Sequence, residues 1–290
     1  MHYLVYQAYR NLDNLHECLY SLYSFAAHPI ACKVVIYTDR ADYLRPLAPQ
    51  ELEIHYRHLT DQEIDNWQGE AKFVHRFKIC MLLDLVAQLD PADQLLYVDT
   101  DVVFKRSAQP LYENIAQGTL WMHCNEGNIV GQAKTHRIFK KVSKFLQSAT
   151  PSSQAVPQTQ DMWNAGVLGL RATDKDMLQE VLALTDQIYR DFEIHVVEQL
   201  AFSVVFSQQE NRSLQAAEDY LFHYWNFKEF RTVLSAFFAK RTDPAIIRQK
   251  VKQIDPQRLI QPKLAYEQLS FIPKTLRKLR GKWDFPPYEI

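Results

Sequence analysis

The chain has 290 residues, of which 47% are hydrophobic and 23% are charged, values typical of a globular protein with one large α/β domain or a domain with an appendage. Its formal net charge of −1 argues against a general polyanion-binding protein, and we expect no nucleic-acid partner. The four cysteines show no C-x-x-C pattern, so we interpret them as buried free thiols. The sequence has no signal-like start and no apolar run long enough to span a bilayer, which predicts a cytoplasmic location.

The first part of the chain alternates strand and helix patterns. We expect strands at residues 2–8, 33–39, 51–59 and 94–104, and amphipathic helices at 12–28 and 71–90. This alternation is typical of an α/β fold with a Rossmann-type, mostly parallel sheet flanked by helices. Ligands of such sheets bind beyond the carboxyl ends of the strands, so residues 6–9, 38–39 and 99–101 are predicted to line one edge.

The second part carries further elements and then a change of composition. We expect strands at 119–127 and 162–172, helices at 135–147, 174–192 and 197–207, and a mobile loop at 148–160. From residue 240 onward the sequence contains twelve Lys and Arg and five Asp and Glu, which gives this part a net charge of +7. We therefore predict a main domain over 1–239 and a basic, mainly helical C-terminal extension over 240–290. The extension is either a solvated helical surface or a peripheral contact with anionic lipid on the inner face of a membrane.

Asp99 and Asp101 directly follow the apolar run Leu95–Val98. Two carboxylates at i and i+2 can share one hard cation where the backbone turns, and Mg²⁺ or Mn²⁺ prefers such ligands together with diphosphate oxygens. A metal of this kind neutralises the charge that develops on a departing nucleoside diphosphate. The sequence therefore predicts a divalent-metal site that holds a nucleotide diphosphate, with Thr100 beside it.

The segment 94–104 contains the run Leu-Leu-Tyr-Val-Asp-Thr-Asp-Val-Val-Phe. It resembles the D-x-D strand of GT-A-fold glycosyltransferases, especially the family-eight-like group. Four further segments are similar to that group and follow in its order. They are His-Arg-Phe-Lys-Ile at 75–79, Trp-Asn-Ala-Gly-Val-Leu-Gly-Leu at 163–170, Glu-Gln at 198–199 and His-Tyr-Trp-Asn-Phe-Lys at 223–228. The resemblance covers residues 3 to 230.

The resemblance implies a role for each matching position. Asp99, Asp101 and His223 would be the metal ligands, and the imidazole favours Mn²⁺ over Mg²⁺. Lys228 would neutralise the diphosphate, and Glu198 and Gln199 would lie beneath the donor sugar as catalytic residues. Further substrate contacts would come from Arg76, Lys78, Asn164, Ala165 and Gly166, although Arg76 and Lys78 are equally explained as the solvated face of their helix. Tyr6, Gln7 and Asp39 are nucleoside-binding candidates by position at the strand ends alone; they are equally explained as turn residues.

Three departures from the family pattern affect the site. The family's Asp-Gln pair is Glu-Gln here, the interval from His223 to Lys228 is one residue shorter, and the glycine within that interval is missing. The resemblance implies that the anomeric configuration is retained. An inverting course would need a carboxylate base, for which Asp161 or Glu198 are the candidates.

Three other functions are compatible with parts of the sequence. Asp-Thr-Asp-Val-Val also fits the nucleophile motif of haloacid-dehalogenase-type phosphatases, but that motif normally ends the first strand of its domain. A sugar nucleotidyltransferase would need a glycine-rich loop after the first strand, and the first glycine here is Gly69. A nucleotide-sugar-binding protein without catalysis stays open because of Glu198. We predict a hexosyltransferase that uses a UDP-sugar and a saccharide or lipid-linked acceptor, in bacterial surface polysaccharide synthesis.

Overall fold

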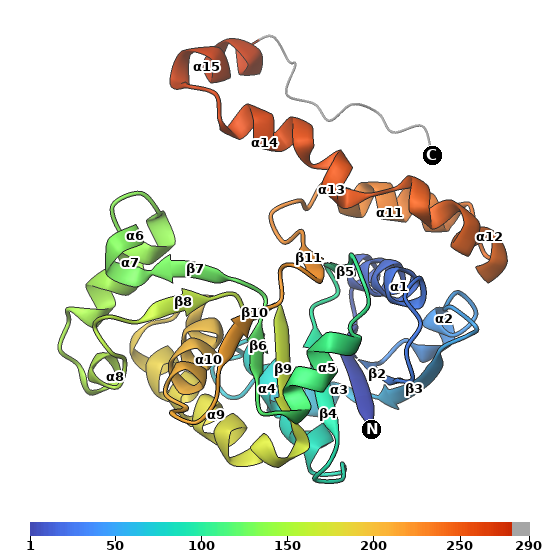
Figure 1. Ribbon diagram of the computed structural model, residues 1–290. Helices are drawn as coiled ribbons and strands as arrows, with labels where there is room; N and C mark the ends of the chain where they lie inside the picture. The colour runs from blue at the N-terminus through green and yellow to red at the C-terminus, as the bar shows by residue number, and fades with distance from the viewer. Residues whose placement is uncertain (280–290) are drawn as a thin grey trace.

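The structure is a computed structural model that describes residues 1–279. Its centre is a seven-stranded sheet (Figure 1). In spatial order the strands are β10 (Leu214–Ala216), β6 (Leu120–Met122), β9 (Val167–Arg171), β4 (Gln94–Val98), β1 (His2–Gln7), β2 (Lys33–Thr38) and β3 (Glu53–His58). β9 is antiparallel to its neighbours β4 and β6, and the other pairs are parallel. The predicted mostly parallel sheet is confirmed.

Helices cover both faces of the sheet, which explains why its central strands are apolar on both sides. Leu4 and Val5 in β1 point to opposite faces, and both are fully buried. One face packs against α1 (Leu12–Ala26) and α5 (Gln109–Ala116), and α11 (Phe230–Ala239) packs against α1 in the same cluster. The other face packs against α3 (Asp61–Trp67), α4 (Arg76–Val86), α9 (Lys175–Asp191) and α10 (Val197–Ser207).

Three segments expected as single strands are each broken by polar residues. The segment 94–104 forms β4 and then β5 (Val102–Phe104), with a turn at 99–101 between them. Likewise, 119–127 divides into β6 and β7 (Asn125–Asn128), and 162–172 into β8 (Asp161–Trp163) and β9. The short pieces form two small antiparallel ribbons, β5 with β11 (Leu221–His223) and β7 with β8. The breaks place polar side chains at the end of the central sheet.

A third hydrophobic cluster lies beside the sheet, under the β7–β8 ribbon. It joins Phe139, Val142 and Leu146 of α7 (Arg137–Leu146) to Ile188 of α9 and Leu200 of α10. The short helices α6 (Ile129–Gln132) and α8 (Pro151–Gln154) flank α7. The segment 148–160, expected as a loop, therefore contains one helix, whose first turn is capped by the Thr150 side chain.

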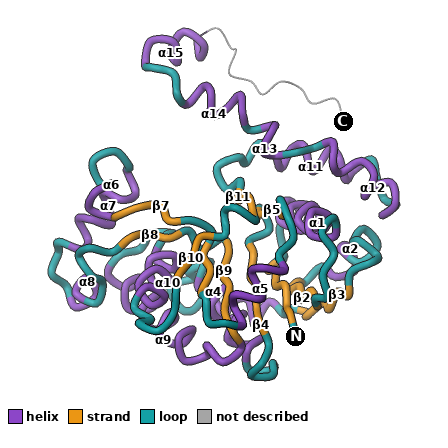
Figure 2. Tube along the Cα trace, viewed as in Figure 1, coloured by secondary structure: helices purple, strands orange, loops and turns teal. Residues whose placement is uncertain are grey.

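The C-terminal part begins as an extension of the core and then leaves it (Figures 1 and 2). Ile247, Ile254 and Leu259 lie in the same hydrophobic cluster as α1. Beyond them α14 has no buried residue and leads to α15, away from the body. The predicted boundary at residue 240 stays a prediction, but the packing shows that residues up to 260 share the main core. The remaining elements are α2 (Ala41–Leu44), η1 (Ala172–Asp174), α12 (Pro244–Lys250), η2 (Val251–Gln253), α13 (Pro256–Leu259), α14 (Gln261–Glu267) and α15 (Phe271–Leu279).

Within residues 1–279, no helix has the length and apolar character needed to cross a bilayer. Residues 280–290, which complete the predicted extension, lie outside the described part of the chain.

Gly169 lies in β9 between β4 and β6, and a Cβ added there would lie 2.9 Å from Trp121 Cβ. We predict that Gly169→Ala lowers the free energy of unfolding by about 1–3 kcal/mol, because the sheet backbone cannot yield to the overlap. Gly131→Ala is the control, since a Cβ there meets its nearest neighbour at 3.6 Å. Urea denaturation measures both variants, and equal stabilities would contradict the prediction.

Candidate functional site

The turn between β4 and β5 presents both predicted carboxylates at the end of the sheet. Because β4 pairs with β9, the Asp99 N–H donates to the Gly166 carbonyl at 2.8 Å, and the chain turns back as Val102 N–H donates to the Asp99 carbonyl at 3.2 Å. Asp101 is buried and Asp99 is partly exposed. The tight turn orients both carboxylates toward the same space, as the spacing predicts.

His223 ends β11, which the β5–β11 ribbon brings next to this turn. Its Nε2 lies 3.0 Å from Asp101 Oδ1, and its Nδ1 lies 2.9 Å from Asn164 Oδ1. Ligand atoms of Asp99, Asp101 and His223 all lie within 4.8 Å of one another. Two segments that are distant in sequence thus form one group with the donor types of a divalent-metal site.

Hydrogen bonding fixes the form of His223 that suits a metal. The Asn164 amide is oriented because its Nδ2 donates to Glu126 at 3.0 Å, so its Oδ1 accepts from the imidazole Nδ1–H. In the neutral ring, the lone pair of Nε2 then points at the Asp101 carboxylate. This repulsion is removed when Nε2 is protonated or when a cation binds between the two groups. Burial lowers the pKa of His223, but the charges of Asp101 and Asp99 outweigh it and raise the pKa. The two carboxylates therefore favour a positive charge beside them, carried by the protonated imidazole or by a bound cation.

Gly166 makes room for the imidazole. A Cβ built at this position would lie 2.3 Å from His223 Cε1, closer than any real contact. The backbone of β9 therefore approaches the histidine ring in a way that only glycine allows.

Lys228 adds an exposed positive charge to the group. Its ammonium lies 3.2 Å from Asp101 Oδ2, and its side chain is 56% exposed. Burial raises the pKa of Asp101, but His223 and Lys228 reverse this and hold it well below its usual range. Asp101 is therefore a carboxylate, the form that binds metal.

Lys78, by contrast, is an internal counterion. Its ammonium lies 3.3 Å from Asp99 and 3.1 Å from Glu198, and it donates to the Ala165 carbonyl at 2.9 Å. Its side chain is only 3% exposed, so the two carboxylates balance its charge inside the protein. Burial raises the pKa of Glu198 to about 7, the Asp99 charge adds to the effect, and Lys78 opposes it.

A cavity of 910 Å³ opens over this group. The cavity is lined by ten of the residues predicted from the sequence: Lys78, Asp99, Asp101, Asn164, Ala165, Gly166, Glu198, Gln199, His223 and Lys228. Its size is that of a site for a nucleotide-sugar or a comparable ligand.

The other predicted residues lie away from the cavity lining. Arg76 forms a two-pronged ion pair with Asp186, at 2.7 and 3.0 Å. Asp161 accepts hydrogen bonds from the Asn125 and Asn128 amides. Tyr6 is fully buried against Ser21, Asp39 accepts from the Arg10 N–H, and Gln7 and Thr100 likewise do not line the cavity. Their predicted roles remain predictions.

Sequence reasoning missed several residues of the cavity wall. Glu126 accepts from Asn164 and, at 2.9 Å, from Gln199 Nε2, so it joins two predicted substrate contacts. Trp225 is 49% exposed and also lines the cavity. Trp225 lies within the quoted segment 223–228, which was the available signal, whereas Glu126 lies in β7, which no quoted motif covers. His136 and Arg137 of the α7 region complete the far wall, for which the sequence offered no motif.

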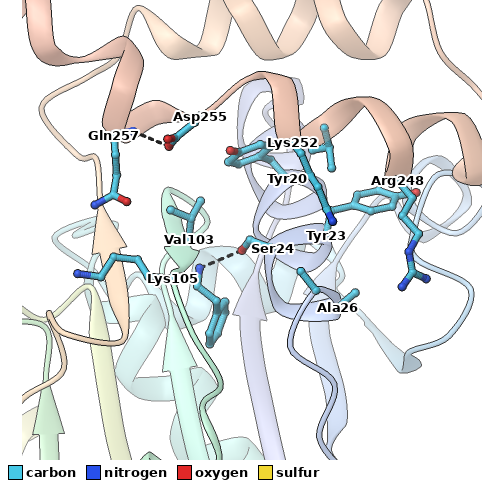
Figure 3. A pocket seen from close by; sticks show the side chains of 13 residues that line it. Tyr20, Tyr23, Ser24, Ala26, Val103, Lys105, Arg248, Lys252, Asp255 and Gln257 are labelled. Carbon is cyan, nitrogen blue, oxygen red and sulfur yellow. Dashed lines mark hydrogen bonds between the residues drawn. The ribbon is translucent and has the colours of Figure 1, made fainter.

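A second, smaller cavity of 350 Å³ lies between α1, β5 and the C-terminal helices (Figure 3). The Tyr20 hydroxyl donates to the Ile254 carbonyl, and the Tyr23 hydroxyl donates to the Leu47 carbonyl. Asp255 accepts from the Gln257 N–H at the start of α13. These wall groups are engaged within the fold, so the larger cavity is the candidate site.

Comparison with known proteins supports the fold. No family model and no curated protein sequence matches the chain. The structure of the galactosyltransferase LgtC with donor and acceptor sugar analogs is similar, with 15% identity over 74% of this chain and 73% of that chain and a TM-score of 0.50. Mouse xyloside xylosyltransferase 1 in its apo form matches with 13% identity over 75% and 86%, also with a TM-score of 0.50. At these identities the likeness shows the fold alone: the mixed α/β, GT-A-like architecture predicted from the sequence is confirmed.

We predict that Lys78→Met lowers the free energy of unfolding by about 3–5 kcal/mol at pH 8, because Asp99 and Glu198 lose their buried counterion. The loss should be smaller at pH 6, where Glu198 takes up a proton and one uncompensated charge disappears. Lys228→Met is the control, and its exposed pair should contribute less than about 1 kcal/mol. Urea denaturation at both pH values measures the effect; equal losses for the two variants would contradict it.

Proposed function

We propose that the chain is a metal-dependent glycosyltransferase that moves a hexosyl unit from a UDP-sugar to a hydroxyl of a saccharide or lipid-linked saccharide. The observation that carries the proposal is the group of Asp99, Asp101 and His223, whose ligand atoms lie within 4.8 Å of one another at the floor of the cavity. The fold shared with LgtC and the xylosyltransferase adds support from architecture. A bacterial surface polysaccharide is the product class we favour.

The donor set fits Mn²⁺, since two carboxylates and an imidazole suit it better than Mg²⁺. When bound, the ion stabilises the negative charge that develops on the departing diphosphate. Lys228, exposed beside Asp101, is placed to neutralise the same diphosphate from the solvent side. Asn164 and the open backbone at Gly166 admit the donor sugar close to β9.

Gln199 and Glu126 form the polar side of the sugar site. Gln199 lies on α10 and is oriented by its hydrogen bond to Glu126. The two candidates for the base of an inverting reaction both have partners within the protein. Asp161 accepts hydrogen bonds from two amides outside the cavity lining, and Glu198 forms an ion pair with Lys78. These engagements favour the retaining course.

The phosphatase alternative is not favoured. In that family the first aspartate ends the first strand of the domain, whereas β4 follows three earlier strands and pairs with an antiparallel β9. The remaining alternative is a binding protein that holds a nucleotide-sugar without transferring it, and the experiment below separates it from the enzyme.

Asp101→Asn is predicted to reduce Mn²⁺-dependent UDP release from UDP-sugars by about a thousandfold or more, because an ion that stabilises the leaving group contributes several kcal/mol. Asp176→Asn removes an exposed carboxylate on α9 and should leave the rate unchanged. A UDP-release assay with a panel of UDP-sugars, with and without Mn²⁺, measures both. Unchanged turnover in the Asp101 variant would defeat the proposal. Metal-dependent UDP binding by the native chain without any turnover would indicate the binding protein.

We also propose that α14 and α15, called here the C-terminal arm, contact anionic lipid. Phe271, Ile272, Leu276 and Leu279 of α15 are exposed, and Lys274 lies on the same helix. An amphipathic helix with apolar and basic residues, whose apolar side chains at 271, 272, 276 and 279 are exposed, suits the interface of a membrane. The arm would hold the enzyme peripherally on the inner face of the membrane, near a lipid-linked acceptor.

The double variant Phe271→Ser and Ile272→Ser is predicted to lower retention on vesicles that contain phosphatidylserine by about tenfold, because two large apolar side chains no longer enter the interface. Val130→Ser with Ile246→Ser removes two exposed apolar side chains elsewhere and serves as the control. Vesicle co-sedimentation measures retention. Equal retention of both variants and the native chain would show that the arm does not bind membrane.

A further inference from the structure

The far wall of the cavity belongs to a segment with a strong excess of positive charge. Between Glu126 and Asp161 the sequence contains no Asp or Glu. The basic residues in this interval, called here the basic stripe, are Lys134, Arg137, Lys140, Lys141 and Lys144. All of them are exposed, and within residues 1–279 none of their side chains forms an ion pair or a hydrogen bond.

Helical spacing gathers these charges on one face. Arg137, Lys140, Lys141 and Lys144 stand at positions i, i+3, i+4 and i+7 of α7, so their side chains follow one another along the helix surface. Like charges at these spacings repel and destabilise a helix. A row of unpaired cations of this kind is therefore explained best by an anionic ligand that lies along it.

The stripe begins at the reaction site. Arg137 and the adjacent His136 line the same 910 Å³ cavity whose floor carries Asp99, Asp101 and His223. The donor diphosphate is already accounted for at that floor, by the metal group and Lys228. The positive charges at the far wall are therefore available to a different ligand, which would enter the cavity from the α7 side.

We propose that the acceptor is an anionic saccharide, which carries carboxylate or phosphate groups and lies along the basic stripe while its reacting hydroxyl enters the cavity. This inference rests on the proposed glycosyltransferase function and names the acceptor class for the same site. Trp225, half exposed on the cavity wall, offers an aromatic face for a sugar ring.

The packing of α7 favours a saccharide over a lipid surface. A helix that lies in a membrane interface needs a free apolar face. Here that face is used: Phe139, Val142, Phe145 and Leu146 are buried in the third hydrophobic cluster. Of the large apolar side chains between residues 127 and 160, Val130 alone is exposed, so the stripe offers charge without apolar anchors.

The experiment compares matched charged and neutral saccharides. The probes are galacturonic acid tetramers with their methyl esters, and phosphorylated mannose oligomers with their dephosphorylated forms, each measured by calorimetry with UDP and Mn²⁺ present. The test variant is Lys140→Gln, Lys141→Gln and Lys144→Gln in one chain. The control, Lys175→Gln, Lys240→Gln and Lys252→Gln, removes the same charge from exposed lysines elsewhere.

We expect at least one anionic probe to bind about tenfold more tightly than its neutral partner at low salt, as several exposed charge pairs acting together can provide. This preference should shrink to about twofold in the stripe variant and persist in the control. It should also fall as salt is raised, because exposed charges are screened. The carboxylate and phosphate arms identify which anion the stripe accepts.

Three results would overturn the inference. They are equal binding of charged and neutral probes by the native chain, a preference that survives in the stripe variant, and loss of binding to phosphatidylserine vesicles in that variant with its saccharide preference unchanged. The last would assign the stripe to a membrane. The proposed glycosyltransferase function is tested separately, by measuring Mn²⁺-dependent UDP release by the native chain. Turnover without any anionic preference would therefore defeat only the acceptor class.

Discussion

The buried ammonium of Lys78 is the interaction on which the site depends. It joins α4, the end of β4 and α10 by contacting Asp99, the Ala165 carbonyl and Glu198, and burial in a low-dielectric region makes each of these contacts strong. Without this counterion, two carboxylates facing a sheet edge would repel each other and the metal-ligand group would not be preformed. The cost of desolvating the lysine is offset by two opposite charges within 3.3 Å and by its hydrogen bond to the Ala165 carbonyl.

The second constraint is a chain of hydrogen bonds that fixes the direction of each ligand. Gln199 donates to Glu126, which also accepts from Asn164, and Asn164 in turn accepts from His223. The imidazole is thereby held with Nε2 toward the carboxylates, the arrangement that outer partners give to a metal-binding histidine. The same chain connects the metal group to the wall where a donor sugar would lie. In the proposed function, metal binding and sugar binding would be geometrically coupled, since a shift of the Asn164 amide would move both the imidazole and Glu126.

The sequence predicts the sheet and the ligand group because both depend on local patterns. Apolar runs that end in polar pairs mark parallel strands, which places Asp99 and Asp101 at a sheet edge, whereas His223 was expected from the family resemblance and arrives through the β5–β11 ribbon. What the sequence cannot separate is the role of two cations on one helix. Arg76 and Lys78 are two residues apart, so they point to different sides of α4, and tertiary packing decides which meets the site. The folding of residues 244–260 against α1 is equally a matter of distant contacts, because their basic composition suggests a solvated surface.

The cavity has an asymmetric charge distribution that one ligand alone does not explain. Its floor holds two carboxylates that require a cation, while its far wall holds Arg137 at the start of a row of unpaired lysines. A nucleotide-sugar carries its negative charge in the diphosphate, and the proposed function places that charge at the floor. If the donor were the only ligand, the far wall would gain nothing from cations that repel one another and leave α7 less stable. The proposed pair of ligands accounts for this arrangement, because donor and acceptor would approach the transferred sugar from opposite sides, each held by charges of its own.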